Sequence, residues 1–287
     1  MKPILATLIA VIAGSSFANA NENTQIMTDI LPVQSLVQMV AGEQAEIGVL
    51  MGPDADPHHF QMRPSQVRAL GQAGAVIFVG DALTPWLAEK AGGLAPDATL
   101  LALMEIEGNH AHTDEHGADP HAWLDIDNAI LWVGSIAETL GQRDPANAAL
   151  YQANAGAART ALLDVKAEVT ALAEQVAGSH VVMAHDAFRY LTEALGIEVE
   201  GSITDSHAHA PGAAHIAEIE NALEEHPADC MLTEAGEPDK HAERLAEEHG
   251  IRVAVLDPLG VTVNPGPGLY VAMMRANLAA LGDCLAD

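Results

Sequence analysis

The sequence has few basic side chains, few aromatic ones and only two cysteines. Twelve Lys and Arg residues stand against 40 Asp and Glu residues, so the 287-residue chain carries a formal charge of −28 at neutral pH. Nucleic-acid-binding proteins neutralise phosphates with Lys and Arg, so we expect no nucleic-acid partner and an attraction for cations. Aromatic residues make up 3% of the chain but apolar residues 49%, which predicts a large core of Ala, Leu, Val and Ile.

After its first residues, the sequence also lacks any run of about 18 uncharged apolar residues, the length that a membrane-spanning helix needs. Residues 1–20 combine Lys2, an apolar stretch from Ile4 to Gly14 and the small-x-small sequence Ala18-Asn19-Ala20. These are the three parts of a secretory signal peptide. We predict cleavage between Ala20 and Asn21 and a mature protein in the periplasm; an uncleaved membrane anchor is the alternative.

The two cysteines, Cys230 and Cys284, fit an exported chain. An even pair in an oxidising compartment predicts a disulfide, which would tie the last helix to the body of its domain. Neither cysteine has a second ligand at the short spacing that zinc sites use, so a Cys–Cys metal site is the weaker alternative.

Short segments rich in β-branched residues alternate with longer helical patterns, which is typical of parallel α/β architecture. The predicted strands are 46–50, 75–79, 99–103, 180–184, 228–232 and 252–256. A helix predicted over 145–177 follows Asp144-Pro145 and ends before Gly178, and its roughly 33 residues would extend about 50 Å. We therefore expect an N-terminal lobe at 21–143, a connecting helix at 144–178 and a C-terminal lobe at 179–287.

Three of the 14 histidines and one aspartate occupy positions that suit metal binding. His58 and His121 each follow Asp-Pro, which stiffens the loop that presents the imidazole. His185 and Asp257 each follow a predicted strand, where open α/β sheets place their ligands. Together they would form a four-coordinate set of three nitrogens and one oxygen. Their long spacings form no local metal motif, so ordinary surface histidines are the alternative.

A polar stretch at 105–119, EIEGNHAHTDEHGAD, predicts an exposed loop that carries His110, His112 and His116. Its residues His112, Glu115 and His116 match the H-x-x-E-H pattern of a zinc metallopeptidase class. That pattern requires a helix, and the glycines and proline around it argue against one. We therefore do not expect an enzyme. The loop either collects cations with low affinity or is an ordinary solvated loop.

Five sequence blocks, in order, resemble the ZnuA-like zinc group among the metal-binding solute receptors of ABC transporters. They are GPDADPHHFQMRPSQVRAL, GADPHAWLDIDNA, DPANAALYQANAGA, VVMAHDAFRYL and LDPLG. The resemblance implies two Rossmann-like α/β lobes joined by one long rigid helix, with a metal in the cleft between them. It also implies His58, His121, His185 and Asp257 as ligands of one tight Zn²⁺.

The same resemblance implies delivery of zinc to a membrane permease, a monomer, a periplasmic zinc chaperone as a further partner, and weaker zinc binding at the His-rich loop. Manganese and iron receptors of the family tend to have a carboxylate at the third ligand position, where this chain has His185. A manganese or iron receptor is thus an alternative, as are an adhesin and a metal buffer or metallochaperone. His59 is a neighbour of the first ligand, and His207 and His209 match no ligand block.

Overall fold

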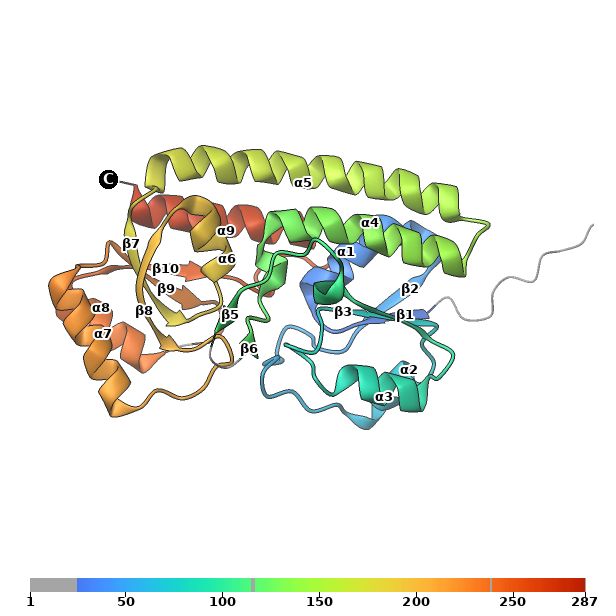
Figure 1. The fold of residues 1–287 in the computed structure, drawn as a ribbon, viewed down its shortest axis with the longest axis horizontal. Coiled ribbons are helices and arrows are strands. Elements are labelled where there is room, and N and C mark those ends of the chain that lie inside the picture. The colour runs from blue at the N-terminus through green and yellow to red at the C-terminus, as the bar shows by residue number, and fades with distance from the viewer. Residues whose placement is uncertain (1–24, 115–116, 238, 287) are drawn as a thin grey trace, which may run out of the picture.

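The computed structural model describes residues 25–114, 117–237 and 239–286, so the predicted signal peptide and His116 lie outside the described residues. Two lobes, each built on a four-stranded parallel sheet, lie beside each other along one long helix (Figure 1). Among the described helices, none combines the length and apolar character that crossing a bilayer requires.

The N-terminal sheet is entirely parallel, with strand order β2-β1-β3-β4. Its strands are β1 (Gln25–Thr28), β2 (Glu46–Val49), β3 (Ala75–Phe78) and β4 (Thr99–Ala102). The helices of this lobe are α1 (Leu31–Ala41), α2 (Pro64–Leu70), α3 (Leu87–Leu94) and α4 (Ile126–Arg143), with short 3-10 turns η1 (Gly42–Gln44), η2 (Leu103–Glu105) and η3 (Ala122–Leu124). All four residues of β3 are buried, as expected for a strand inside a parallel sheet.

The C-terminal sheet is also entirely parallel, with strand order β10-β9-β7-β8. Its strands are β7 (His180–His185), β8 (Glu198–Thr204), β9 (Cys230–Glu234) and β10 (Arg252–Leu256). Its helices are α6 (Arg189–Leu195), α7 (Ala213–Glu225), α8 (Lys240–His249) and α9 (Leu269–Leu285). The predicted disulfide is confirmed: Cys230 on β9 is bonded to Cys284 on α9.

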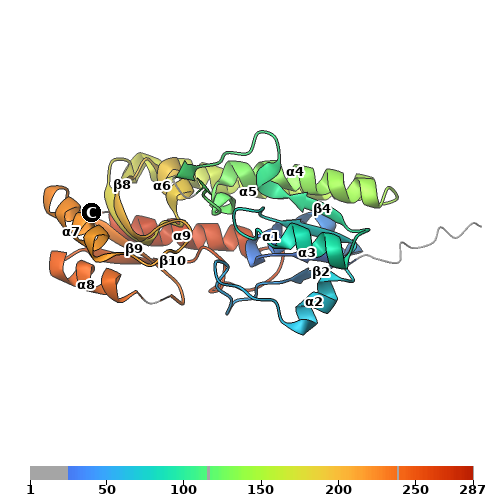
Figure 2. The same ribbon diagram turned by 60° about the horizontal axis from the view of Figure 1, so that its bottom comes forward.

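The predicted long helix is confirmed as α5 (Ala148–Val176), whose 29 residues extend about 44 Å. It begins later than expected because Asp144 is held in a turn, where its Oδ2 accepts hydrogen bonds from Asn147 and Tyr151. In both views α5 runs along α4 of the N-terminal lobe and α9 of the C-terminal lobe (Figures 1 and 2). One cluster of buried apolar residues is continuous through both lobes, so the helices form a single spine.

The six predicted strands are all present, with ends shifted by no more than two residues. The prediction missed β1, β8 and the two-residue strands β5 (Thr113–Asp114) and β6 (Gly117–Ala118), which pair within the stretch predicted to be a loop. Because both sheets are parallel, the carboxyl ends of the strands in each lobe lie at one edge, and the loops that leave those edges form the candidate site.

Candidate metal centre

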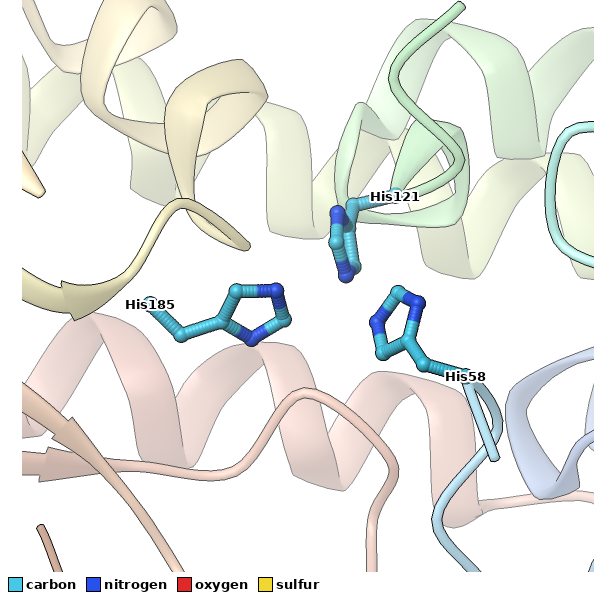
Figure 3. Close-up of side chains that lie close together, drawn as sticks. All are labelled: His58, His121 and His185. Carbon is cyan, nitrogen blue, oxygen red and sulfur yellow. The ribbon is translucent and has the colours of Figure 1, made fainter. Parts of the chain in front are cut away.

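Three imidazoles from widely separated segments converge between the lobes (Figure 3). His58 lies in the loop between β2 and α2, His121 directly precedes η3, and His185 is the last residue of β7. The ring centroids are 5.0 to 5.4 Å apart in the three pairs. One donor nitrogen from each ring lies within 4.8 Å of the other two, so the three side chains can share one ion.

Two of these rings are held in place by carboxylates that bond the ring nitrogen Nδ1. Nδ1 of His121 donates to Asp119 Oδ1 at 2.8 Å, and Nδ1 of His185 donates to Glu234 Oε1 at 2.6 Å. These bonds fix the tautomer and leave Nε2 of each ring as the donor to a metal. Nε2 of His185 is buried and has no hydrogen-bond partner, which is the state expected of a ligand nitrogen prepared for an ion.

The two adjacent histidines, His58 and His59, have different environments. Asp56 Oδ1 accepts the backbone N–H of His58, while Asp56 Oδ2 pairs with Nδ1 of His59 at 2.7 Å. The His59 side chain is 70% exposed and is not among the three converging rings, whereas His58 is half-buried beside them. His59 thus lies outside the three-ring cluster, and its role as a neighbour of the first ligand stays a prediction.

Asp257 lies in the wall of the same pocket but outside the three-imidazole cluster. Its Oδ1 accepts the backbone N–H groups of residues 259, 260 and 261, and its Oδ2 accepts both the N–H and the hydroxyl of Thr262. Both carboxylate oxygens therefore already have partners within the loop. The role of Asp257 as a fourth ligand stays a prediction.

The electrostatics favour neutral imidazole at two of the three positions. Burial, together with the neighbouring rings of His121 and His185, lowers the pKa of His58 to about 3. Burial likewise holds the pKa of His121 well below its usual value. Burial also acts to lower the pKa of His185, but the hydrogen bond and charge of Glu234 outweigh it, so this pKa is raised. Neutral imidazole is the form that binds metals, so two of the three donors need lose no proton at neutral pH.

The donor set fits a tetrahedral cation. Zn–N bonds of about 2.0–2.1 Å place tetrahedral donors about 3.4 Å apart, so the nitrogens, now within 4.8 Å, need only a small inward movement. The pocket around them has a volume of about 500 Å³ and is lined from both lobes. Trp123 closes one side, where its Nε1–H donates to the carbonyl of Pro258 at 2.7 Å and joins the lobes.

Four further histidines form two pairs. His110 and His112 form a second cluster with Glu193, which the sequence did not reveal. His207 and His209 stack near the main pocket with ring centroids 6.0 Å apart, and neither belongs to a donor cluster among the described residues. Sequence reasoning also missed Glu234, for which only its position at the end of a strand was a signal.

The peptidase pattern is not helical in its described part. Thr113–Asp114 (β5) and Gly117–Ala118 (β6) pair as antiparallel strands, and Glu115 and His116 lie outside the described residues. Because Thr113 and Asp114 lie in a strand, the described part of the pattern lacks the helical geometry that this peptidase motif requires.

Two parallel α/β lobes joined by one long helix define the class of two-lobed solute-binding proteins. The fold is similar to a crystal structure of ZnuA, with a TM-score of 0.80 at 24% identity over 92% of this chain and 99% of that chain. It is also similar to FpvC from Pseudomonas aeruginosa in complex with Mn²⁺, with a TM-score of 0.82 at 22% identity over 92% and 98% of the two chains.

The family model of ZnuA, described as zinc-uptake complex component A periplasmic, matches residues 26–284. The chain is 33% identical to the high-affinity zinc uptake system protein ZnuA of Paracoccus denitrificans (strain Pd 1222), over 99% of both chains. It is 27% identical to the protein of the same name from Brucella abortus (strain 2308), over 98% of this chain and 97% of the relative. The chain therefore belongs to the ZnuA family.

Proposed function

We propose that this protein is a periplasmic receptor that captures Zn²⁺ between its lobes and delivers it to the membrane permease of a zinc ABC transporter. The observation that carries the proposal is the convergence of His58, His121 and His185, each from a different segment of the chain. Family membership supports it, because relatives across nearly the whole chain are named zinc uptake proteins.

The proposed sequence of events begins with the three imidazoles. Zn²⁺ binds their nitrogens first, and Asp257 supplies the fourth donor once the ion has displaced Thr262 from its Oδ2. Four protein donors close the coordination sphere, which suits a receptor and not an enzyme, since catalytic zinc keeps a position open. Release requires the C-terminal lobe, which carries His185 and Asp257, to move these ligands away from the others.

Zinc is favoured over manganese by the chemistry of the donors. Imidazole nitrogen is a good ligand for Zn²⁺, whereas Mn²⁺ prefers an octahedral set of oxygens. All three converging side chains offer nitrogen. The alternative of a manganese or iron receptor therefore requires a different donor set from the one described here.

Metal titration of purified apo protein tests the site. We expect one tight zinc equivalent and no competition by equimolar Mn²⁺ in isothermal titration calorimetry with a competing chelator. His58→Ala and His185→Ala should each weaken zinc binding by about 100-fold or more, beyond the loss typical for an outer-shell residue. His59→Ala is the matched control and should bind as the wild type does. Unchanged tight binding in both ligand variants would refute the site.

A separate experiment distinguishes transport from storage. The protein, loaded with ⁶⁵Zn²⁺, is added to vesicles that contain the permease and ATPase of a zinc ABC transporter, and uptake is followed with ATP inside. We expect ATP-dependent uptake with the wild type. Light scattering of the purified protein should show a monomer. A protein that binds zinc tightly but supports no uptake is a buffer or a metallochaperone.

A further inference from the structure

The outer strand β10 of the C-terminal sheet is open along one edge. In the described part of the chain it pairs with β9 alone, in continuous register over all five residues. The carbonyl of Leu256 accepts the N–H of Ala235, which directly follows β9, so the backbone of Leu256 faces its neighbour. Successive residues of a strand direct their N–H and C=O groups to opposite sides, so those of Val253 and Val255 face the open edge.

One face of β10 is also uncovered. The helix α9 packs against the other face, where Ala254 and Leu256 are buried. On the open face, Val253 and Val255 are 50% and 58% exposed, the highest values among the large apolar side chains of the described residues. The helix α8 packs over β7 and β9 and leaves these valines in solvent. Edge strands are usually protected by a charge, a proline or a bulge, and neither valine has such protection.

A groove of about 330 Å³ lies between the two valines and the first turn of α8. No Lys or Arg of the described chain lines it, whereas four carboxylates do, those of Glu234, Glu237, Asp239 and Glu243. The groove thus combines an open strand edge, an apolar wall and negative charge. An extended segment with apolar and basic side chains on one face matches all three features.

The charge and the position of the groove indicate which partner it fits. A second copy of this chain would bring two sets of the same carboxylates together, and like charges across an interface are unfavourable. Part of the groove lining also forms the wall of the metal pocket, namely Glu234, Gly236, Glu237 and Asp239. A segment in the groove therefore lies beside the bound ion. In the proposed function, the permease is the molecule that must reach this place.

We propose that the edge of β10 and the groove beside α8 bind an extended segment of the permease with apolar and basic side chains, which adds to the sheet as a fifth strand. Backbone hydrogen bonds to Val253 and Val255 supply affinity, and the carboxylates select basic side chains. The identity of the partner rests on the proposed function, whereas the preference of the groove for such a segment does not.

The first test measures this preference on the full mature chain. Two synthetic peptides, KTVTKT and ETVTET, are blocked at both ends, labelled with a neutral dye and titrated in fluorescence anisotropy. We expect KTVTKT to bind at least about tenfold more tightly than ETVTET and to lose affinity as salt is added, because salt screens the carboxylates. Absence of KTVTKT binding, or equal binding of both peptides, would overturn the proposal.

Val255→Pro distinguishes strand addition from general charge attraction. The N–H of this residue faces the open edge, so proline removes a donor to an incoming strand and none to β9. We expect KTVTKT to bind at least about tenfold more weakly, with zinc affinity and circular dichroism unchanged. Val255→Thr keeps the N–H and is the matched control, which should bind within about threefold of wild type. Equal binding by Val255→Pro and wild type would overturn strand addition.

Glu243→Lys tests the charge without altering the strand. This change in the groove wall should weaken KTVTKT at least about tenfold. Glu224→Lys, at an exposed position on α7 outside the groove lining, changes the net charge equally and is the control. An equal loss in both variants would show only long-range attraction and would overturn the site.

The second test asks whether the permease occupies the groove. In the vesicle assay, Val255→Pro and Glu243→Lys should each raise the protein concentration for half-maximal zinc uptake at least about fivefold. Unchanged uptake would show that the permease docks elsewhere, and a wild-type dimer that Val255→Pro abolishes would make a second copy the occupant; either result overturns the assignment. Absence of uptake with wild type would refute the proposed function and this partner, while the peptide results would stand.

Discussion

At the scale of single residues, Glu234 and Asp119 determine how well the imidazoles are prepared for an ion. Each carboxylate takes Nδ1 of one ligand histidine and thereby directs Nε2 toward the cluster. Partners of this kind fix ring orientation and raise the basicity of the ligand. They are as much a part of the site as the nitrogens themselves.

Glu234→Gln isolates this contribution. The amide can still accept from His185 but lacks the charge that raises the pKa of the ring, so we expect zinc affinity to fall about 10- to 100-fold. Competition with a chelator measures the loss. Glu237→Gln changes an exposed carboxylate in the wall of the same pocket and is the control; an equal loss there would indicate a general charge effect.

The pKa shifts predict how many protons compete with zinc. His58, with a pKa of about 3, and His121 stay neutral in mildly acidic solution, whereas the raised pKa of His185 makes it the first to protonate. Protonated imidazole cannot bind the ion, so affinity falls as pH drops through the pKa of His185. Between about pH 5 and pH 6 we expect log K to change by about one per pH unit.

Affinity measured across this range checks the prediction. A slope near three would mean that all three rings carry protons in the free protein, and that burial does not keep His58 and His121 neutral. In Glu234→Gln the fall should begin at a lower pH, because the neutral amide no longer raises the pKa of His185.

At the scale of elements, the sequence predicted the long helix and the strands with apolar, β-branched residues, because their patterns are local. It missed β1 because this strand has only four residues and only two residues separate it from α1, so its own pattern is too short to be distinguished. It missed β8 because an edge strand tolerates polar residues, and Glu198 and Glu200 obscure its pattern.

In the candidate site, too, the residues with a local sequence signal were predictable and the distant contacts were not. His58, His121 and His185 have local signals, namely Asp-Pro before an imidazole and the end of a strand. Contacts between distant parts of the chain have little or no local signal: Glu234, whose only signal is the end of a strand, is 49 residues from His185, and Tyr190 is 71 residues from Asp119. Such contacts depend on how the elements pack.

The disulfide joins two elements and gives a prediction about stability. Cys230 and Cys284 are 54 residues apart, and closing a loop of this length stabilises a protein by about 4 kcal/mol in the chain-entropy description. Urea unfolding with and without a thiol reductant should differ by about that amount. The Cys230→Ala/Cys284→Ala double variant controls for the reductant and should not respond to it. Identical midpoints for oxidised and reduced wild type would contradict the prediction.

At the scale of the whole molecule, the continuous core and the spine predict that the lobes unfold together. Apolar residues of α1, α4, α5 and α9 belong to one buried cluster, and ion pairs link α5 to both sides, from Lys166 to Asp127 on α4 and from Glu168 to Arg275 on α9. An ion between the lobes adds a further link. The two lobes are thus expected to behave as one cooperative unit despite their separate sheets.

The distribution of tryptophan makes this prediction measurable. All three tryptophans, at positions 86, 123 and 132, precede α5, so their fluorescence reports on the N-terminal lobe, whereas far-ultraviolet circular dichroism reports on both lobes. We expect the two unfolding curves to coincide without metal. With free zinc at 1,000 times its Kd, both should shift together by about 4 kcal/mol. Fluorescence that is lost before the dichroism would show that the N-terminal lobe unfolds alone and that α5 does not couple the lobes.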